Sequence, residues 1–244
     1  MKDKFAFLEG KLLSSRFYPG FFPLKPNDTV ANLGCGQGPQ AIVYLGQYKQ
    51  MIGVDLNKER LKSSEEATSS YGVRNYTTIC ASVEEIPLRD NSFDKIIAIG
   101  IMPCIPNPTK LCLEANRLLK DNGELLISLP APMYFKFTHF VANVARFIVR
   151  RKTKQAPSTE WNPDALNQRY SLDKWITIVE SQGFKLYKSR ASTLFPPLHL
   201  YGVPRFWFSN DIIHKIDSFF AKMPVLKNCG QDLTCVFVKE KNFS

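Results

Sequence analysis

Three glycines and one acid are spaced in a way that could hold a nucleoside. Gly34, Gly36 and Gly38 form a G-x-G-x-G pattern directly after the apolar run 29–33, and Asp55 lies 21 residues beyond Gly34, at the end of the next apolar run. Glycine has no Cβ, so the backbone can turn tightly and a ligand can approach it closely. A carboxylate behind such a turn can accept hydrogen bonds from both hydroxyls of a ribose.

Pro39 distinguishes this turn from a dinucleotide-binding loop. The dinucleotide fingerprint has its third glycine at that position, and proline there disfavours both NAD and the capture of a pyrophosphate by a helix N-terminus. Proline does suit the first position of a following helix. We therefore expect an adenosine ligand without phosphates, packed against bare backbone. A tight strand-to-helix turn that binds nothing is the alternative.

Apolar runs alternate with amphipathic segments between residues 29 and 130, which is typical of buried parallel strands with helices between them. Repeated β-α-β units of this kind favour a doubly wound α/β domain. The expected strands are 29–33, 51–54, 76–80, 95–99 and 125–129. The expected helices are 58–70, capped by Asn57, and 110–119, ended by Asp121-Asn122-Gly123.

The pattern changes after Pro130. A capped helix over 171–182 and two last strands, 184–191 and 233–238, complete a mainly parallel seven-stranded sheet. Between them lie aromatic and basic stretches that look like cover for an acceptor. The expected organisation is an N-terminal cover segment 1–28, a core 29–130, an inserted cap 131–170, and a C-terminal part 171–244 that contains a second cover segment, 194–231.

The glycine turn and three further stretches together resemble the class I S-adenosylmethionine-dependent methyltransferases. The turn is similar to motif I of that family, and 81–94 is similar to the segment between its third and fourth strands. Residues 106–123 resemble its helix before strand five, and 170–184 resemble a late helix of the small-molecule branch, which includes quinone and sugar methyltransferases. The resemblance implies a Rossmann-like fold and S-adenosylmethionine as the cofactor.

The resemblance also implies a set of cofactor contacts. The turn lines the methionine part, Asp55 binds the ribose, and Leu56 packs on the adenine. Tyr18 is either a further cover of the cofactor or a core aromatic. Residues after the third and fourth strands meet the adenine edge and the amino-acid end. The expected cofactor-binding residues are Asn32, Gly34, Cys35, Gly36, Gly38, Asp55, Leu56, Ser82, Val83, Ile99 and Gly100.

Two single residues and one pair of residues depart from the family pattern. Asn32 stands where the family usually has an acid within motif I, and Ser82 stands where an aspartate usually meets the adenine amine. Both side chains keep hydrogen-bonding capacity, so we expect cofactor binding to persist. Pro103-Cys104 replaces a frequent Glu-His pair, so a base at that histidine has no counterpart here.

A general base is needed if the acceptor is a hydroxyl or a carbon acid. His139 and His199 lie in the two cover segments, and Tyr170 and Glu160 are comparable candidates. Histidines in loops are often only polar edges, which is the explanation we favour for both, so no residue is assigned as the catalytic base. The six cysteines lack CxxC spacing, which indicates reduced thiols and no metal site.

Composition and charge limit the classes of function. The chain has 244 residues, of which 44% are hydrophobic and 22% charged, and no run approaches the about 18 apolar residues of a membrane span. The N-terminal residues do not form a secretory signal, so we expect a cytoplasmic protein.

The net charge of +10 is concentrated after Pro130, and residues 131–170 alone carry seven basic and two acidic side chains. No RNA-binding module accompanies this basic stretch, which disfavours nucleic acid as a partner.

Within the cap, 137–148 has helical apolar spacing and is followed by Arg150-Arg-Lys-Thr-Lys154. A lid over a hydrophobic acceptor, a helix at an anionic membrane surface and a core-packed helix with a basic end all fit this pattern. We expect a methyltransferase that transfers a methyl group in line to oxygen, nitrogen or carbon of a small or lipidic metabolite. The alternatives are an RNA methyltransferase that uses the basic half, and a non-catalytic subunit with the same fold.

Overall fold

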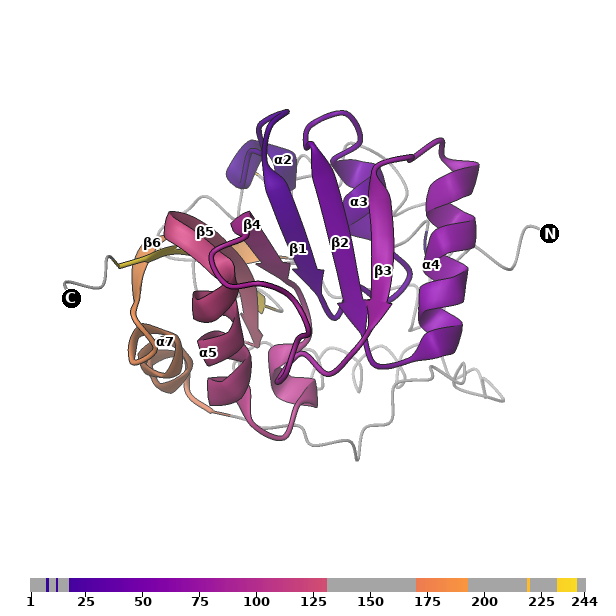
Figure 1. The fold of residues 1–244 in the computed structure, drawn as a ribbon. Helices are drawn as coiled ribbons and strands as arrows, with labels where there is room; N and C mark the ends of the chain where they lie inside the picture. Colours follow the sequence, from indigo (N-terminus) through magenta and orange to yellow (C-terminus); the bar gives the residue numbers. More distant parts are fainter. Residues whose placement is uncertain are drawn as a thin grey trace, which may run out of the picture.

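The computed structural model describes residues 8, 12, 18–130, 170–192, 219 and 232–240, which build a single sheet with helices on both faces (Figure 1). The strands are β1 (Thr29–Leu33), β2 (Gln50–Asp55), β3 (Tyr76–Cys80), β4 (Phe93–Ala98), β5 (Leu119–Pro130), β6 (Phe184–Ser192) and β7 (Asp232–Lys239). The helices are α2 (Tyr18–Phe21), α3 (Pro39–Val43), α4 (Lys58–Ser70), the 3₁₀ turn η1 (Met102–Cys104), α5 (Pro108–Leu118) and α7 (Leu172–Glu180).

The sheet has the strand order β3-β2-β1-β4-β5-β7-β6. Strands β1 to β5 pair in parallel, whereas β7 is antiparallel to both of its neighbours. The order reverses at β1, from which the chain builds outward on both sides. This arrangement confirms the prediction of a doubly wound, mainly parallel sheet of seven strands.

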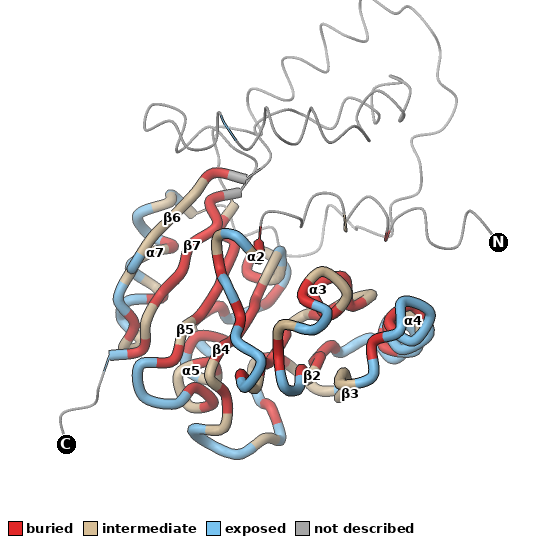
Figure 2. The backbone as a smooth tube through the Cα atoms, turned by 90° about the horizontal axis from the view of Figure 1, so that it is seen from above, coloured by how far each residue is buried: buried red, intermediate tan, exposed pale blue. Residues whose placement is uncertain are grey.

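Two hydrophobic clusters fill the two faces of the sheet, because successive strand residues point to opposite sides. Ile96 belongs to the cluster under α5 and α7, together with Leu111 and Trp175. Its neighbour Ile97 belongs to the other cluster, together with Tyr44. Figures 1 and 2 show α5 and α7 on the front of the sheet and α2 and α3 behind it.

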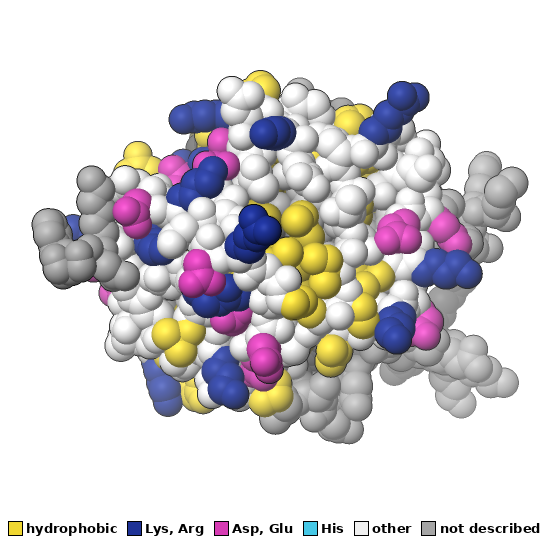
Figure 3. All heavy atoms as spheres, in the orientation of Figure 1, with side chains coloured by type: hydrophobic (Ala, Val, Ile, Leu, Met, Phe, Trp, Pro, Cys, Tyr) yellow, Lys and Arg dark blue, Asp and Glu magenta, His cyan; other side chains and the backbone are white. Residues whose placement is uncertain are grey.

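The front of β1 to β3 has no described helix over it. Figure 3 shows hydrophobic side chains gathered there, between α5 and α4. Ile52 and Leu88 are half-buried and pack against the front cluster. The connection between β3 and β4, residues 81–92, runs beside α5 on this face in place of a helix (Figure 1).

Local capping signals were read correctly at two helices. The Asn57 side chain accepts a hydrogen bond from the Arg60 amide at 2.9 Å and caps α4. Ser171 accepts one from the Lys174 amide at 3.4 Å and caps α7. In both cases the cap satisfies an amide that has no partner within the helix.

The predicted end of the helix over 110–119 was wrong. Helix α5 ends at Leu118, and Leu119 already pairs with Phe93 in the sheet. The turn signal Asp121-Asn122-Gly123 lies within β5, where the register with β4 shifts and Asn122 adopts a φ of 59°. The signal therefore marks an irregularity of the strand, and the helix is ended by contacts from elsewhere in the chain.

No helix in the described ranges is long and apolar enough to cross a membrane. The cover segments predicted at 131–170 and 194–231 lie outside the described residues except for Tyr170 and Phe219, so their role stays a prediction.

Lys239, near the end of β7, holds the C-terminus of α5. It is 5% exposed, and its ammonium donates to the carbonyls of Asn116 at 2.9 Å and Leu119 at 2.7 Å and to the Asn91 side chain at 3.1 Å. A lysine can be buried when its donors are satisfied in this way. The contacts tie the last strand to a helix more than 120 residues earlier in the chain.

We predict that Lys239→Met lowers the free energy of unfolding by about 2 kcal/mol, because it leaves buried carbonyl acceptors without a donor. Chemical denaturation measures the change. Lys120→Met is the matched control, because Lys120 is 46% exposed and its ion pair with Asp94 at 2.7 Å is worth about 0–1 kcal/mol at the surface. Equal effects of the two substitutions would contradict the role given to Lys239.

Candidate functional site

The carboxyl ends of β1 to β4 meet at one edge of the sheet, because these strands are parallel. Chain connections leave β1 and β4 in opposite directions there, which is where doubly wound sheets bind their ligands. The turn 34–38 follows β1 at this point. Residues 55–56, 82–83 and 99–100 reach the same edge from β2, β3 and β4.

Asp55 converges on the glycine turn. Its Oδ2 accepts a hydrogen bond from the Gly36 amide at 2.9 Å, and its Oδ1 accepts one from the Asn57 amide at 3.0 Å. A carboxylate has about four acceptor positions, so each oxygen keeps capacity for a further donor. The carboxylate is therefore fixed in orientation and can still accept two ribose hydroxyls.

The three glycines of the turn have φ angles of 68°, 53° and 71°, in the left-handed region that disfavours residues with a Cβ. Their surroundings differ. A Cβ on Gly34 would lie 2.8 Å from Ile101, and one on Gly38 would collide with Ser64, whereas one on Gly36 would meet nothing within 4 Å. Gly34 and Gly38 are thus needed for packing, and Gly36 presents bare backbone to open space.

A second stretch of bare backbone lies at the end of β4. Gly100 has a φ of 72°, and a Cβ there would also meet nothing within 4 Å. Its amide donates to the buried Ser128 hydroxyl at 2.7 Å, which fixes the end of β4 against β5. A flat ligand could approach the chain at both Gly36 and Gly100.

Leu56 supplies an apolar surface beside the carboxylate. It follows Asp55 directly and is 72% exposed, although it is a large hydrophobic side chain. Leu56, Asn57, Lys58 and Glu59 line an open hollow of about 380 Å³ at the start of α4. The position and exposure of Leu56 fit its predicted role as a surface for the adenine.

Asn32 and Cys35 support the turn from beneath. Asn32 is 1% exposed, and its side-chain amide donates to Gln40 at 3.3 Å. Cys35 is buried, and burial raises the pKa of its thiol to about 12. A Cβ on Gly53 would collide with both the Tyr76 hydroxyl and the Cys35 sulfur, which shows how closely these groups pack. The structure therefore does not place these two predicted cofactor-binding side chains on the open face of the turn.

Gln37 was missed by sequence reasoning. Its side-chain carbonyl oxygen is buried and has no hydrogen-bond partner, although it lies within the turn. A buried polar atom without a partner is uncommon and requires a reason. Together with the bare backbone at Gly36, this acceptor indicates that the turn fits a ligand that carries a donor group. No sequence signal separates this glutamine from an ordinary turn residue.

Ser82 and Val83 lie at the start of the connection from β3 to β4. The Ser82 hydroxyl accepts from the Glu84 amide at 3.2 Å, and Val83 is 6% exposed in the front cluster. The Ile99 side chain is half-buried on the back of the sheet. Only the backbone of Ile99 therefore faces the edge of the sheet where the glycine turn lies. The contacts predicted for these three residues remain predictions.

Of the candidates for covering or catalytic roles, the structure describes Tyr18 and Tyr170. Tyr18 is 7% exposed within the back cluster, as expected for a core aromatic. The Tyr170 ring lies 4.9 Å from the Trp175 ring and 4.0 Å from the Lys174 ammonium, beside α7. His139, His199 and Glu160 lie outside the described residues. Among the residues that the structure describes, no group of His, Cys, Asp or Glu could hold a metal ion.

The doubly wound sheet is that of the Rossmann-like class of proteins, and the edge that holds Asp55, Gly36 and Gly100 is suited to a nucleoside. A family model described as "Methyltransferase domain" matches residues 24–183 of the chain. The chain therefore belongs to the methyltransferase domain family, and its cofactor is S-adenosylmethionine.

Known proteins agree with this assignment. The uncharacterised methyltransferase YcgJ of Bacillus subtilis is 26% identical over 66% of this chain and 63% of its own length. The 2-phytyl-1,4-naphtoquinone methyltransferase of Nostoc sp. is 32% identical over 42% of this chain and 47% of its own length. The chain therefore spans only about half to two-thirds of the length of these two relatives. A crystal structure of a putative methyltransferase from Bacillus halodurans shares the fold, with a TM-score of 0.60 at 17% identity over 96% of this chain and 99% of that one.

We predict that a thiol reagent at pH 8 labels the exposed Cys80 fastest and leaves Cys35 and Cys112 unmodified. Cys104 is exposed too, but partial burial raises the pKa of its thiol, so it should react more slowly than Cys80. Burial raises the pKa of both protected thiols to about 12, so few of them are thiolates at pH 8. Peptide mass spectrometry follows the rate at each site. Rapid labelling of Cys35 in the folded protein would show that the turn is open beneath as well as above.

Proposed function

We propose that the protein is an S-adenosylmethionine-dependent methyltransferase of a small or lipidic metabolite. The observation that carries the proposal is the convergence of Asp55 on Gly36, with a hydrogen bond of 2.9 Å, at a turn that leaves open space above its backbone. A carboxylate held against bare backbone is suited to a ribose whose neighbouring groups carry no phosphate.

The cofactor supplies a methyl group already activated on a sulfonium sulfur, so the protein's task is alignment and the exclusion of water. Asp55 orients the ribose through its two oxygens, and Leu56 supports the adenine. The open backbone at Gly36 and Gly100 lets the amino-acid end lie close to the chain, where the Gln37 carbonyl oxygen can accept from an ammonium group.

The acceptor is proposed to be an apolar metabolite methylated on oxygen, nitrogen or carbon. The Nostoc relative is named for a naphthoquinone with a phytyl chain, which supports an acceptor of quinone type. The segments 131–170 and 194–231 are proposed as its cap, since both are rich in aromatic residues and the first is also rich in basic residues. His139, His199 and Tyr170 stay candidates for a base, which a hydroquinone or carbon acceptor needs and an ionised acceptor does not.

Calorimetric titration with S-adenosylhomocysteine tests the cofactor site. We expect micromolar binding by the wild type and a loss of about tenfold or more in affinity for Asp55→Ala, which removes a charged acceptor. Gly36→Ala should weaken binding similarly, because its methyl group enters the space that a ligand needs.

Gly46→Ala is the matched control for Gly36→Ala. Gly46 also has a positive φ, 78°, with open space around its Cβ position, but it precedes β2 at the opposite edge of the sheet. Both substitutions should cost about 1 kcal/mol in stability, because both put an alanine in the left-handed region. Only Gly36→Ala should weaken binding. No binding by the wild type, or equal losses in both glycine variants, would refute the proposed site.

A transfer assay tests the enzyme against the alternatives. Labelled methyl should pass from S-adenosylmethionine to a reduced, prenylated naphthoquinone or a related apolar acceptor and partition into an organic phase. Turnover with any acceptor excludes a non-catalytic subunit. Retention on RNA that falls steeply with salt would instead favour the RNA methyltransferase.

A further inference from the structure

The connection between β3 and β4, residues 81–92, must hold a fixed shape without being a helix or a strand. Near its start lie Ser82 and Val83, which the proposed function places beside the adenine. Within itself it has only short-range backbone bonds, such as Glu85 to the Ser82 carbonyl at 3.2 Å and Leu88 to the Ile86 carbonyl at 2.7 Å. Local turns of this kind do not fix a segment of this length by themselves.

Arg117 on α5 is bonded to this connection along its length. Its guanidinium donates to the carbonyls of Ile86 and Leu88, both at 2.8 Å, and pairs with the Asp90 carboxylate. Its own backbone carbonyl accepts from the Asn91 amide at 2.9 Å. One residue therefore satisfies four groups of a segment that lies about thirty positions earlier in the sequence.

Glu114 orients this guanidinium and adds a contact of its own. It accepts from Arg117 Nε at 2.9 Å and Nη2 at 2.8 Å, and from the Ile86 amide at 2.8 Å. The bond from Arg117, opposed by partial burial and aided by the Ile86 amide, lowers the pKa of the Glu114 carboxyl. The Glu114 side chain is 16% exposed and that of Asp90 is 66% exposed, so the bidentate pair with Glu114 is the firmer of the two.

The N-terminal end of α5 holds the same connection a second time. The Glu84 carboxylate accepts from the Asn107 amide at 2.8 Å, and the Asn107 side chain caps the first turn of α5. Val83 and Ile86 are also buried, in the front cluster that contains Leu111 of α5. Contacts with helix α5 therefore determine the conformation of residues 81–92.

We propose that Arg117 and Glu114 are positioning residues of the cofactor site: they hold residues 81–92 so that Ser82 and Val83 border the adenine. This inference rests on the proposed function, since it concerns the same site. Neither side chain contacts the ligand. Both affect cofactor binding through the backbone of residues 81–92, which they hold in place. The planar guanidinium of Arg117 bonds two carbonyls and a carboxylate at the same time. A lysine at this position would lose some of these hydrogen bonds.

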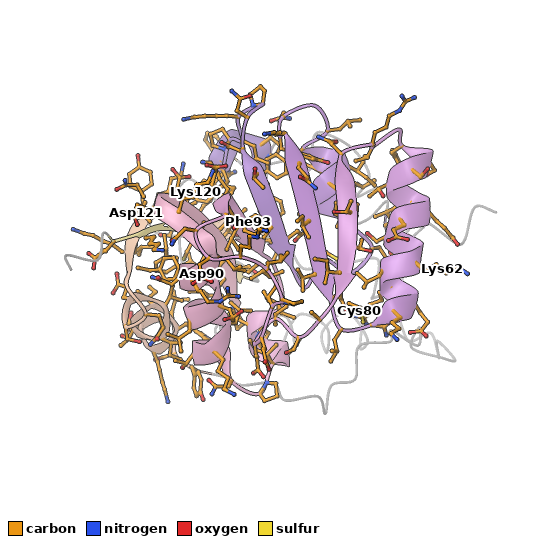
Figure 4. All side chains as sticks on the ribbon, viewed as in Figure 1. Lys62, Cys80, Asp90, Phe93, Lys120 and Asp121 are labelled. Carbon is orange, nitrogen blue, oxygen red and sulfur yellow. The ribbon has the colours of Figure 1, made fainter. Side chains whose placement is uncertain are left out.

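The test compares Arg117→Ala and Arg117→Lys with Lys120→Ala in S-adenosylhomocysteine titrations of the full-length protein. Lys120 is the matched control, because it also forms an ion pair next to α5, with Asp94 at 2.7 Å, but has no hydrogen bond or ion pair to residues 81–92 (Figure 4 labels Lys120 and Asp90). We expect the affinity to fall about tenfold in Arg117→Ala, less in Arg117→Lys, and less than about twofold in Lys120→Ala.

Amide hydrogen exchange supplies a readout that loss of overall stability would not produce. In Arg117→Ala, peptides from 81–92 should exchange faster while those from the glycine turn 34–38 keep their wild-type rate, and saturating S-adenosylhomocysteine should restore part of the protection. If Arg117→Ala does not fold, Arg117→Lys carries the same comparison.

The outcomes separate the two proposals. Wild-type protein that does not bind S-adenosylhomocysteine refutes the proposed function, and the positioning role with it. Wild-type binding together with unchanged affinity in Arg117→Ala refutes the positioning role alone. Equal losses in the Arg117 and Lys120 variants, or faster exchange throughout the protein, would show that Arg117 stabilises the fold in general.

Discussion

The hydrogen bond from the Gly36 amide to the Asp55 carboxylate is the constraint on which the site depends. It joins the turn after β1 to the end of β2, and the Gly34 and Cys35 amides reinforce the same junction by donating to the Val54 carbonyl at 2.8 and 3.1 Å. The turn cannot shift without moving the carboxylate. The Gly36 backbone and the Asp55 carboxylate therefore have a fixed geometry before a ligand binds. This lowers the entropic cost of ordering them on binding.

The other half of the site is fixed differently, since the connection 81–92 has no ladder of backbone bonds. Its shape comes from α5, which in turn is held at its C-terminus by Lys239 from the last strand. A chain of contacts thus runs from β7 through α5 to the adenine side of the proposed site. Residues far apart in the sequence are needed together, so the last strand contributes to the site without approaching it.

The sequence was sufficient for features that depend on neighbouring residues. The alternation of apolar runs predicted six strands to within two residues, although β5 begins six residues earlier than predicted. Asn57 was recognised as a cap and Ser171 as the start of a capped helix, and the spacing of Gly36 and Asp55 predicted their convergence. Features that depend on distant partners could not be predicted. The burial of Lys239 and the true end of α5 both require knowledge of where β7 lies, and an amphipathic pattern alone cannot supply it.

The departures from the family pattern at Asn32 and Ser82 take on a different meaning in the folded chain. The Asn32 amide is satisfied by Gln40 beneath the turn, and the Ser82 hydroxyl is satisfied by the Glu84 amide. Neither replacement leaves an unpaired polar group among the described residues, and neither disturbs the carboxylate of Asp55. Because the ligand is proposed to meet mainly backbone and one fixed acid, the loss of charge at the two supporting positions is compatible with a working cofactor site.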